Sequence, residues 1–209
     1  MDKKPLVSMI VPVFNEEENV RPLYERLSAV FDGLKERFDF EIIFTDNHSQ
    51  DGTFDALADL AKNDKRIRVF RFSRNFGFQR SIMTGYLKAQ GDAAIQIDCD
   101  LQDPPELIPD FIAKWEEGHD VVYGIRQGRQ EGALINAMRC VFYWLIDAMS
   151  EEQLPRQAGD FRLVSRRVID IMGQVDDSHP YLRGMIASFG FKQAGIPYDR
   201  AARERGESK

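Results

Sequence analysis

Residues 7–34 read VSMIVPVFNEEENVRPLYERLSAVFDGL, a strand pattern that passes directly into a helix pattern. The run Val7–Phe14 is apolar and short, as expected for a buried strand. Asn15 then stands at a helix N-cap position, with Glu18 three residues later as the partner of a capping box. Apolar residues follow with a spacing near that of a helix: Val20, Leu23, Leu27, Val30, Phe31 and Leu34. The segment therefore predicts a strand joined by a short turn to an amphipathic helix.

The same unit recurs along the first 125 residues. Further strands are predicted at Phe40–Thr45, Ile67–Phe72, Ala93–Ile97 and Asp120–Tyr123. Further helices are predicted at Thr53–Lys62, Gln79–Ala89 and Glu106–Glu117, the last opened by Pro104 and Pro105. Strands that alternate with helices in this way predict an α/β fold with a Rossmann-like, mostly parallel sheet and helices on both faces.

The pattern changes after residue 125. It predicts a long helix over Ala133–Met149, a loop around Pro155, a short strand near Phe161–Val164, and helices at Arg166–Met172 and Tyr181–Ser188. The sequence shows no internal repeat, linker or low-complexity segment. A single domain over residues 1–209 is therefore expected.

The charge of the chain limits its partners. Its 209 residues include 28 Lys and Arg against 34 Asp and Glu, which gives a net charge of -6. A globally acidic chain argues against nonspecific nucleic-acid binding, so no nucleic-acid partner is expected. In residues 121–209, however, basic groups outnumber acidic ones. This half either faces an anionic ligand or carries ordinary solvated charge.

Cysteine usage and hydropathy bear on the environment of the chain. The two cysteines, Cys99 and Cys140, cannot form a disulfide framework, which fits a reducing compartment. The longest apolar run, Cys140–Ile146, is far shorter than the ~20 residues of a spanning helix. The N-terminus is interpreted as a strand and not a signal peptide, because Pro12 interrupts its apolar stretch and acidic residues follow directly.

The polar residues that follow each predicted strand are the place to look for a site, because ligands of open α/β sheets bind outside the carboxyl ends of the strands. Asp98 and Asp100 follow the fourth strand one residue apart, and Gln102 adds a neutral oxygen. Such oxygens suit Mg²⁺ or Mn²⁺, which keep few protein ligands and take others from substrate phosphates. The alternative for the two aspartates is an ordinary acidic surface turn. Cys99, which lies between them, is interpreted as a small buried filler and not as a nucleophile.

Other candidates are weaker when taken alone. Asp46 ends the second strand. It either accepts a hydrogen bond from a base N–H or a ribose hydroxyl, or caps a turn or helix. The sequence holds neither a dinucleotide-binding nor a P-loop glycine motif, so phosphate charge must be met by metal and arginine, for which Arg126 is a candidate. Asp160 follows a small-residue turn and either enters a site or forms a surface pair with Arg162.

The motifs together resemble those of the inverting family 2 glycosyltransferases. More narrowly they resemble the polyprenyl-phosphate branch, which includes dolichyl-phosphate mannosyltransferase-like and bactoprenol glucosyltransferase-like enzymes. The resemblance covers nearly the whole chain. Six stretches carry it: IVPVFNEEENV (10–20), TDNHSQDGT (45–53), RNFGFQ (74–79), IDCDLQDPPE (97–106), YGIR (123–126) and QAGDFRL (157–163). The fourth and the sixth of these are the most specific.

The resemblance implies a GT-A fold that binds a nucleotide-diphosphate sugar, UDP- or GDP-linked, across the strand ends. Residues 1–125 would form the nucleotide-sugar-binding part. Its nucleotide pocket would be lined by Pro12, Phe14 and Glu16, with Asp46 reading the base or ribose. A Mg²⁺ or Mn²⁺ ion would be held by Asp98, Asp100 and Gln102. Asp98, Cys99 and Asp100 would also contact the donor.

Residues 126–209 would form the acceptor side. The resemblance assigns a catalytic role to Asp160 and places Arg126 near donor or acceptor phosphate, with Arg203 and Lys209 in the tail that meets acceptor phosphate. It implies transfer of a hexose to a polyprenyl (undecaprenyl or dolichyl) phosphate with inversion, at the cytoplasmic face of a membrane. The chain itself is expected to be soluble, with membrane helices beyond residue 209 in the full-length protein and a homo-oligomer as an open possibility.

One stretch departs from the family pattern. Where the family has Asp-Asp-Gly-Ser, this chain has Asp46-Asn47-His48-Ser49. Asn and His tolerate a positive φ better than most residues, so the turn is expected to survive without glycine. Three alternatives stay open at this point: a sugar-hydroxyl acceptor, a non-catalytic nucleotide-sugar-binding module, and a metal-dependent phosphohydrolase with Asp98 as nucleophile.

Overall fold

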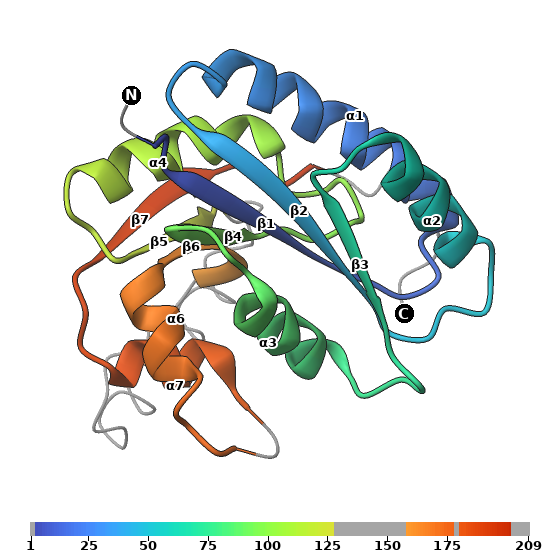
Figure 1. Cartoon of the computed structure of the whole chain (residues 1–209). Coiled ribbons are helices and arrows are strands. Elements are labelled where there is room, and N and C mark those ends of the chain that lie inside the picture. The colour runs from blue at the N-terminus through green and yellow to red at the C-terminus, as the bar shows by residue number, and fades with distance from the viewer. Residues whose placement is uncertain (1–2, 128–157, 178–179, 202–209) are drawn as a thin grey trace, which may run out of the picture.

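The computed structural model describes residues 3–127, 158–177 and 180–201, and these build a seven-stranded sheet in the order β3-β2-β1-β4-β6-β5-β7 (Figure 1). Strand β6 runs antiparallel to both of its neighbours, and the other pairs are parallel. The strands are β1 (Leu6–Val13), β2 (Asp39–Asp46), β3 (Ile67–Arg71), β4 (Ala93–Gln96), β5 (Val121–Arg126), β6 (Ala158–Ser165) and β7 (Gln193–Tyr198). The predicted α/β fold with a mostly parallel sheet is confirmed.

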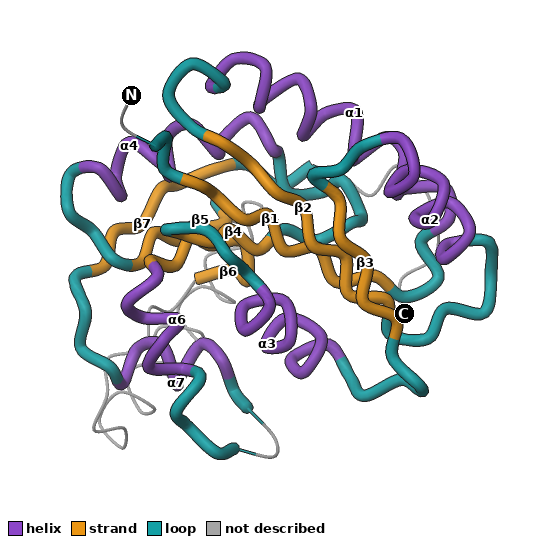
Figure 2. The backbone as a smooth tube through the Cα atoms, viewed as in Figure 1, coloured by secondary structure: helices purple, strands orange, loops and turns teal. Residues whose placement is uncertain are grey.

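Helices cover both faces of the sheet, as predicted (Figures 1 and 2). One face carries α1 (Glu17–Leu34), α2 (Thr53–Asn63) and α4 (Ile108–Glu116), the last preceded by a 3₁₀ turn at Pro105–Leu107. The other face carries α3 (Phe78–Lys88), α6 (Arg166–Met172) and α7 (Leu182–Ser188). Among the described residues, no helix is long and apolar enough to cross a membrane.

Strand β1 divides the interior into two cores because its side chains alternate between the faces. Val7, Met9 and Val11 join the core under α1, α2 and α4. Ile10 points the other way and joins the core under α3, α6 and α7. A strand buried on both faces reads as a continuous apolar run, which is why the sequence around β1 has no polar alternation.

One edge of the sheet collects the residues of interest. The carboxyl ends of β1, β2, β4 and β5 meet there because these strands are parallel in direction. Strand β6 is antiparallel, so its amino end, with Asp160, reaches the same edge. Asp98 follows β4 there, and Arg126 ends β5 beside Tyr198 of β7. Residues more than 100 positions apart are thereby brought together.

One local expectation is contradicted, one strand was not predicted, and one predicted segment lies outside the described residues. The Asn15 N-cap is wrong: α1 begins at Glu17 after Glu16, and Asn15 has a φ of 53°. Its Oδ1 instead accepts a hydrogen bond from the Gln50 amide at 2.7 Å, which ties the loop after β1 to the loop after β2. Strand β7 was not predicted. The predicted helix Ala133–Met149 and the loop around Pro155 lie outside the described residues.

Strand β7 escaped prediction for a physical reason. Gly195 and Pro197 interrupt its pattern, and proline removes a donor from the sheet ladder. Proline is tolerated on a strand at the edge of a sheet, and β7 is the edge strand beside β5. Its position is thus fixed by pairing with a distant strand and not by local propensity.

Two helical glycines offer a matched test of packing. In α3, a Cβ on Gly85 would lie 2.2 Å from Cγ2 of Ile10, whereas nothing lies within 4 Å of a Cβ on Gly33 in α1. Gly85→Ala should lower the free energy of unfolding by about 1–3 kcal/mol through overpacking. Gly33→Ala should raise it by about 0.4–1 kcal/mol by restricting the unfolded chain. Urea unfolding of both variants measures this, and stabilisation by Gly85→Ala would contradict the packing of α3 on β1.

Candidate functional site

A cavity of about 660 Å³ opens at the carboxyl edge of the sheet. The structure brings most of the predicted donor-site residues into its wall: Pro12, Phe14, Glu16, Asp98, Cys99, Asp100 and Gln102. Further lining residues come from the loops after β2 and β3, from α3 and from the segment after β7: Asn47, Asn75, Gly77, Phe78, Ser81 and Arg200. The volume lies within the range of small-molecule sites.

Backbone strain gathers around this cavity. Asn15, His48 and Leu101 have φ values of 53°, 66° and 61°, and they are the positive-φ residues other than glycine among those described. They lie in the loops after β1, β2 and β4. Non-glycine residues in this conformation are uncommon, and such strain clusters at functional sites. The strained conformations therefore mark these three loops as candidate parts of a functional site.

The loop after β2 keeps its turn without glycine, as predicted. His48 takes the left-handed conformation at the position where the family has glycine. The Asn47 side chain accepts a hydrogen bond from the Phe76 amide at 2.8 Å and so joins this loop to the one after β3. Asp46 is fully buried behind the cavity wall, where its Oδ1 accepts from the Ser49 amide at 2.9 Å.

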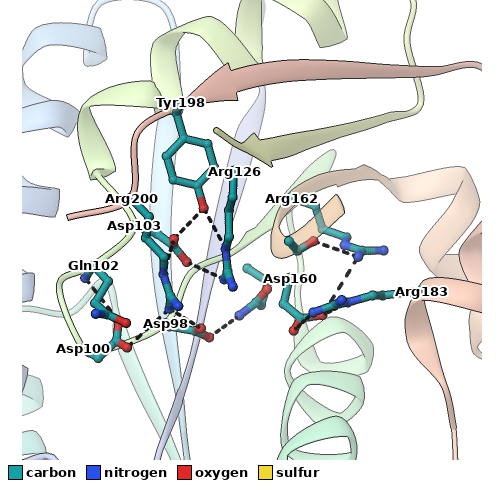
Figure 3. A network of polar contacts seen from close by, with 12 residues as sticks. Asp98, Asp100, Gln102, Asp103, Arg126, Asp160, Arg162, Arg183, Tyr198 and Arg200 are labelled. Atoms are coloured by element: carbon teal, nitrogen blue, oxygen red, sulfur yellow. Dashed lines mark hydrogen bonds and ion pairs between the residues drawn. The ribbon is translucent and has the colours of Figure 1, made fainter. Parts of the chain in front are cut away.

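Asp98 and Asp100 converge on one position (Figure 3). One guanidinium nitrogen of Arg200, Nη2, lies 3.9 Å from Oδ2 of Asp98 and 3.4 Å from Oδ2 of Asp100. The other oxygens of the pair are oriented by neighbours, since Gln96 Nε2 donates to Asp98 at 2.8 Å and the Gln102 amide donates to Asp100 at 3.2 Å. A single cation can therefore contact both carboxylates.

This arrangement fits a divalent cation of the Mg²⁺ or Mn²⁺ type. Both side chains present hard carboxylate oxygens to one cationic position. Within the described residues, no group of three or more His, Cys, Asp or Glu side chains is placed to hold a metal. The protein's share would then be the two aspartates and Gln102, which leaves the other coordination positions to substrate phosphate and water.

Asp103 forms a buried anchor beside this pair. Its side chain is 0% exposed, and Tyr198 donates its hydroxyl to Oδ1 at 2.5 Å. Arg200 Nε lies 3.2 Å from the same oxygen, and Arg126 Nη2 lies 3.5 Å from Oδ2. Arg126 Nε also donates to the Tyr198 hydroxyl at 3.2 Å. Gly124 leaves the room that the Tyr198 ring needs, since a Cβ there would lie 2.5 Å from it.

Asp160 belongs to a second, adjoining group (Figure 3). Arg183 donates to both of its oxygens, at 2.8 and 2.6 Å, and Arg162 lies 3.9 Å away. The alternative of a surface pair with Arg162 is wrong, because that arginine is 5% exposed. Burial raises the pKa of Asp160, but the hydrogen bonds and charge of Arg183 outweigh it, so the pKa lies below its ordinary value.

The sequence missed several members of this site. They are Gln96, Asp103, Arg183, Tyr198 and Arg200. The excess of basic residues after position 120 was the available signal for the arginines, and Asp103 already lay within the acidic motif. Arg203 and Lys209 lie outside the described residues.

A mostly parallel sheet with paired aspartates at its carboxyl edge is the arrangement of the GT-A glycosyltransferases. The family model for "Glycosyl transferase family 2" matches residues 8–171, and the chain belongs to this family. The family resemblance of the motifs is thereby confirmed.

Relatives extend the match over nearly the whole chain. This chain is 41% identical over 203 residues to an uncharacterized glycosyltransferase, YkcC, of Bacillus subtilis (strain 168). The alignment covers 97% of this chain and 62% of that protein. The chain is 36% identical over 204 residues to the bactoprenol glucosyl transferase of Shigella phage SfV, covering 97% of this chain and 66% of that one. The chain thus spans about two thirds or less of the length of these relatives.

Solved structures share the fold. The mannosyltransferase PcManGT from Pyrobaculum calidifontis, in complex with GDP-Man and Mn²⁺, aligns with a TM-score of 0.62 at 20% identity over 93% of this chain and 55% of its own. Glucosyl-3-phosphoglycerate synthase from Mycobacterium tuberculosis, with Mn²⁺, UDP-Glc and glycerol 3-phosphate, aligns with a TM-score of 0.60 at 19% identity over 97% of this chain and 73% of its own. These confirm the GT-A fold.

The titration of Asp98 gives a test of the acidic cluster. Burial, and after it the charges of Asp103, Asp100 and Asp160, raise the pKa of Asp98 from 3.8 to about 7. A carboxyl group whose pKa is raised on folding adds stability below its unfolded pKa, and that stability is lost as the pH rises through about 7. In chelator, the Tm of the wild type should therefore fall relative to that of Asp98→Asn between about pH 5 and about pH 8.

Thermal melts of both proteins over this range measure the effect. Asp32→Asn is the matched control, because Asp32 is exposed on α1 and pairs with Lys35 at the surface. Its Tm difference from the wild type should not follow the same pH dependence. A Tm difference for Asp98→Asn that is constant with pH would contradict the crowding of the three acids.

Proposed function

We propose that this chain transfers a hexose from a UDP- or GDP-sugar to a polyprenyl phosphate, with inversion and with Mg²⁺ or Mn²⁺. The observation that carries the proposal is the convergence of Asp98 and Asp100 on one cationic position in the wall of the cavity. Membership of glycosyl transferase family 2 supports the reaction class. The relatives named bactoprenol glucosyl transferases support the lipid-phosphate acceptor.

The donor would occupy the cavity formed mainly by residues 1–125. Pro12, Phe14 and Glu16 line it at the carboxyl end of β1 and in the turn that follows, where the nucleotide would lie. Asp46 does not line the cavity, so in this proposal it shapes the turn behind the pocket. Its neighbour Asn47 lines the cavity and would contact the nucleotide. A non-catalytic module is less favoured, because the turn whose altered sequence suggested it keeps its left-handed residue at His48 and its contact between Asn47 and Phe76.

The acceptor would approach from the side formed by residues 126–209. Arg126 and Arg183 carry fork-shaped donor groups suited to phosphate oxygens, and Arg203 and Lys209 are proposed to meet the acceptor phosphate as well. The lipid would place this side against the cytoplasmic face of a membrane. The basic excess of this half of the chain fits an anionic partner.

The chemical step is a displacement at the anomeric carbon. An acceptor phosphate oxygen forms the new bond, the bond to the donor diphosphate breaks, and the nucleoside diphosphate leaves with the electron pair. A divalent ion held by Asp98 and Asp100 would supply positive charge against the leaving diphosphate. Arg126 and Arg200, held by Asp103, add donors that stabilise the same charge.

A phosphate nucleophile does not need a strong base, because its second pKa is about 6 and it is anionic near neutral pH. The role of Asp160 would then be to orient Arg183, to which it is bound through both oxygens. A sugar-hydroxyl acceptor would need a base, and Asp160 would be the candidate. The pairing of Asp160 with Arg183 favours the phosphate acceptor, since it lowers the pKa of Asp160 and a carboxylate with a lowered pKa is a weaker base.

Donor binding is tested by thermal shift with UDP-glucose, UDP-GlcNAc, UDP-galactose and GDP-mannose, each with and without Mn²⁺. A ligand that binds only the folded state raises the Tm. One donor should raise it in the presence of Mn²⁺, and Asp100→Asn should abolish that rise. Transfer to undecaprenyl phosphate is then measured with this donor, and no shift with any donor would contradict the proposal. Phosphate release without an acceptor would instead favour a phosphohydrolase.

Replacement of Asp160 distinguishes the two kinds of acceptor. Asp160→Asn should lower kcat by less than about 100-fold, because general-base catalysis contributes about 10²–10⁴-fold and is not required here. Arg183→Gln should cause a loss of similar size, since Asp160 acts through that arginine. Steady-state kinetics with undecaprenyl phosphate measure both. A loss near 10⁴-fold for Asp160→Asn alone would instead establish a base role.

A further inference from the structure

Arg200 lies where a divalent cation would bind. Its Nη2 is within 3.9 Å of Asp98 and 3.4 Å of Asp100, and its Nε is 3.2 Å from Asp103 (Figure 3). A Mg²⁺ or Mn²⁺ ion bound to the first two carboxylates would approach their oxygens to about 2.0–2.2 Å. The guanidinium group and the ion cannot both occupy this position, since two cations would then be in contact between the same acids.

The backbone of Arg200 is fixed on both sides. The Tyr198 carbonyl accepts from the Gln127 amide at 2.8 Å, and the Ala201 amide donates to the Gln102 carbonyl at 3.0 Å. These bonds tie the segment after β7 to the end of β5 and to the acidic loop itself. The side chain of Arg200, in contrast, is 29% exposed and lines the cavity, so it has room to turn within the cavity. Any exchange with a cation is therefore a side-chain movement.

The charges decide where that side chain goes. Asp98, Asp100 and Asp103 bring three carboxylates into one loop. Among the described residues, Arg126 and Arg200 are the arginines that contact them. A divalent ion that arrives alone must displace Arg200 from two of its partners and then lie beside it. An ion that arrives with a diphosphate brings negative charge to which Arg200 can turn, so the displaced arginine gains a new partner.

We propose that Arg200 competes with the divalent cation for Asp98 and Asp100 and turns to the donor diphosphate when the cation binds. Cation and nucleotide sugar then bind together, each strengthening the other. The inference rests on the proposed function for the identity of the donor. Arg200 is by this account a positioning residue that couples two ligands, and its effect appears in binding before any transfer occurs.

Mn²⁺ binding measured by the EPR signal of the free ion tests this, without and with UDP, on the whole chain. Without UDP, Arg200→Gln should bind Mn²⁺ at least about fivefold more tightly than the wild type, because the competitor is gone. Arg200→Lys keeps a cation and should remain close to the wild type. UDP should tighten Mn²⁺ binding to the wild type more than to Arg200→Gln, because the variant has lost the group that responds to diphosphate.

Arg26→Gln is the matched control, since it removes an arginine from a surface pair with Glu106 and changes the net charge equally. Its Mn²⁺ affinity should not change. Equal or weaker Mn²⁺ binding by Arg200→Gln would overturn the inference, and so would a wild type whose Mn²⁺ affinity is unaffected by UDP. Asp98→Asn separates the two proposals: if it binds Mn²⁺ as the wild type does, the proposed metal site fails as well, whereas loss of binding leaves only the role of Arg200 in question.

Discussion

The requirement that three neighbouring carboxylates be neutralised governs the carboxyl edge of this sheet. Asp98, Asp100 and Asp103 lie in one six-residue loop, and Asp103 is removed from solvent completely. Charges so close together and so poorly solvated repel strongly unless cations lie among them. Arg126 and Arg200 meet this need: Arg126 ends β5 and Arg200 follows β7, and both strands lie beyond β6 in the sheet. The outer strands thus stabilise the acidic loop as well as extending the sheet.

The antiparallel strand β6 makes this meeting possible. If β6 ran parallel to β4, its amino end and Asp160 would lie at the opposite edge of the sheet. Its reversed direction places Asp160 beside the carboxyl end of β4, where Arg183 from α7 reaches it. Two groups of ion pairs, one around Asp103 and one around Asp160, then flank Asp98. This arrangement separates a side that would hold the donor from a side that would hold the acceptor.

Local sequence patterns were sufficient for most of the fold. The strands of the first half and the helices between them follow from apolar runs and helical spacing, because the apolar residues that each element buries form a pattern within that element. Strand β7 does not follow, since Gly195 and Pro197 break its pattern and only pairing with β5 defines it. The acidic pair of the site was predictable because it adjoins a strand. The positions of Arg183 and Arg200 could not be predicted, since they depend on tertiary contacts that produce no pattern in the neighbouring sequence.

The ion pairs around Asp160 bear on the kind of acceptor that the site can use. A carboxylate that receives both donor groups of Arg183 is stabilised in its charged form, and taking a proton would cost part of that interaction. Such a group is better suited to hold an arginine in place than to activate a hydroxyl. An acceptor that already carries negative charge needs no base. It needs cationic side chains that bind it in addition to those that bind the donor diphosphate. In the proposed reaction, the guanidinium groups of Arg126 at Asp103 and of Arg183 at Asp160 would offset part of the repulsion between the donor diphosphate and the acceptor phosphate.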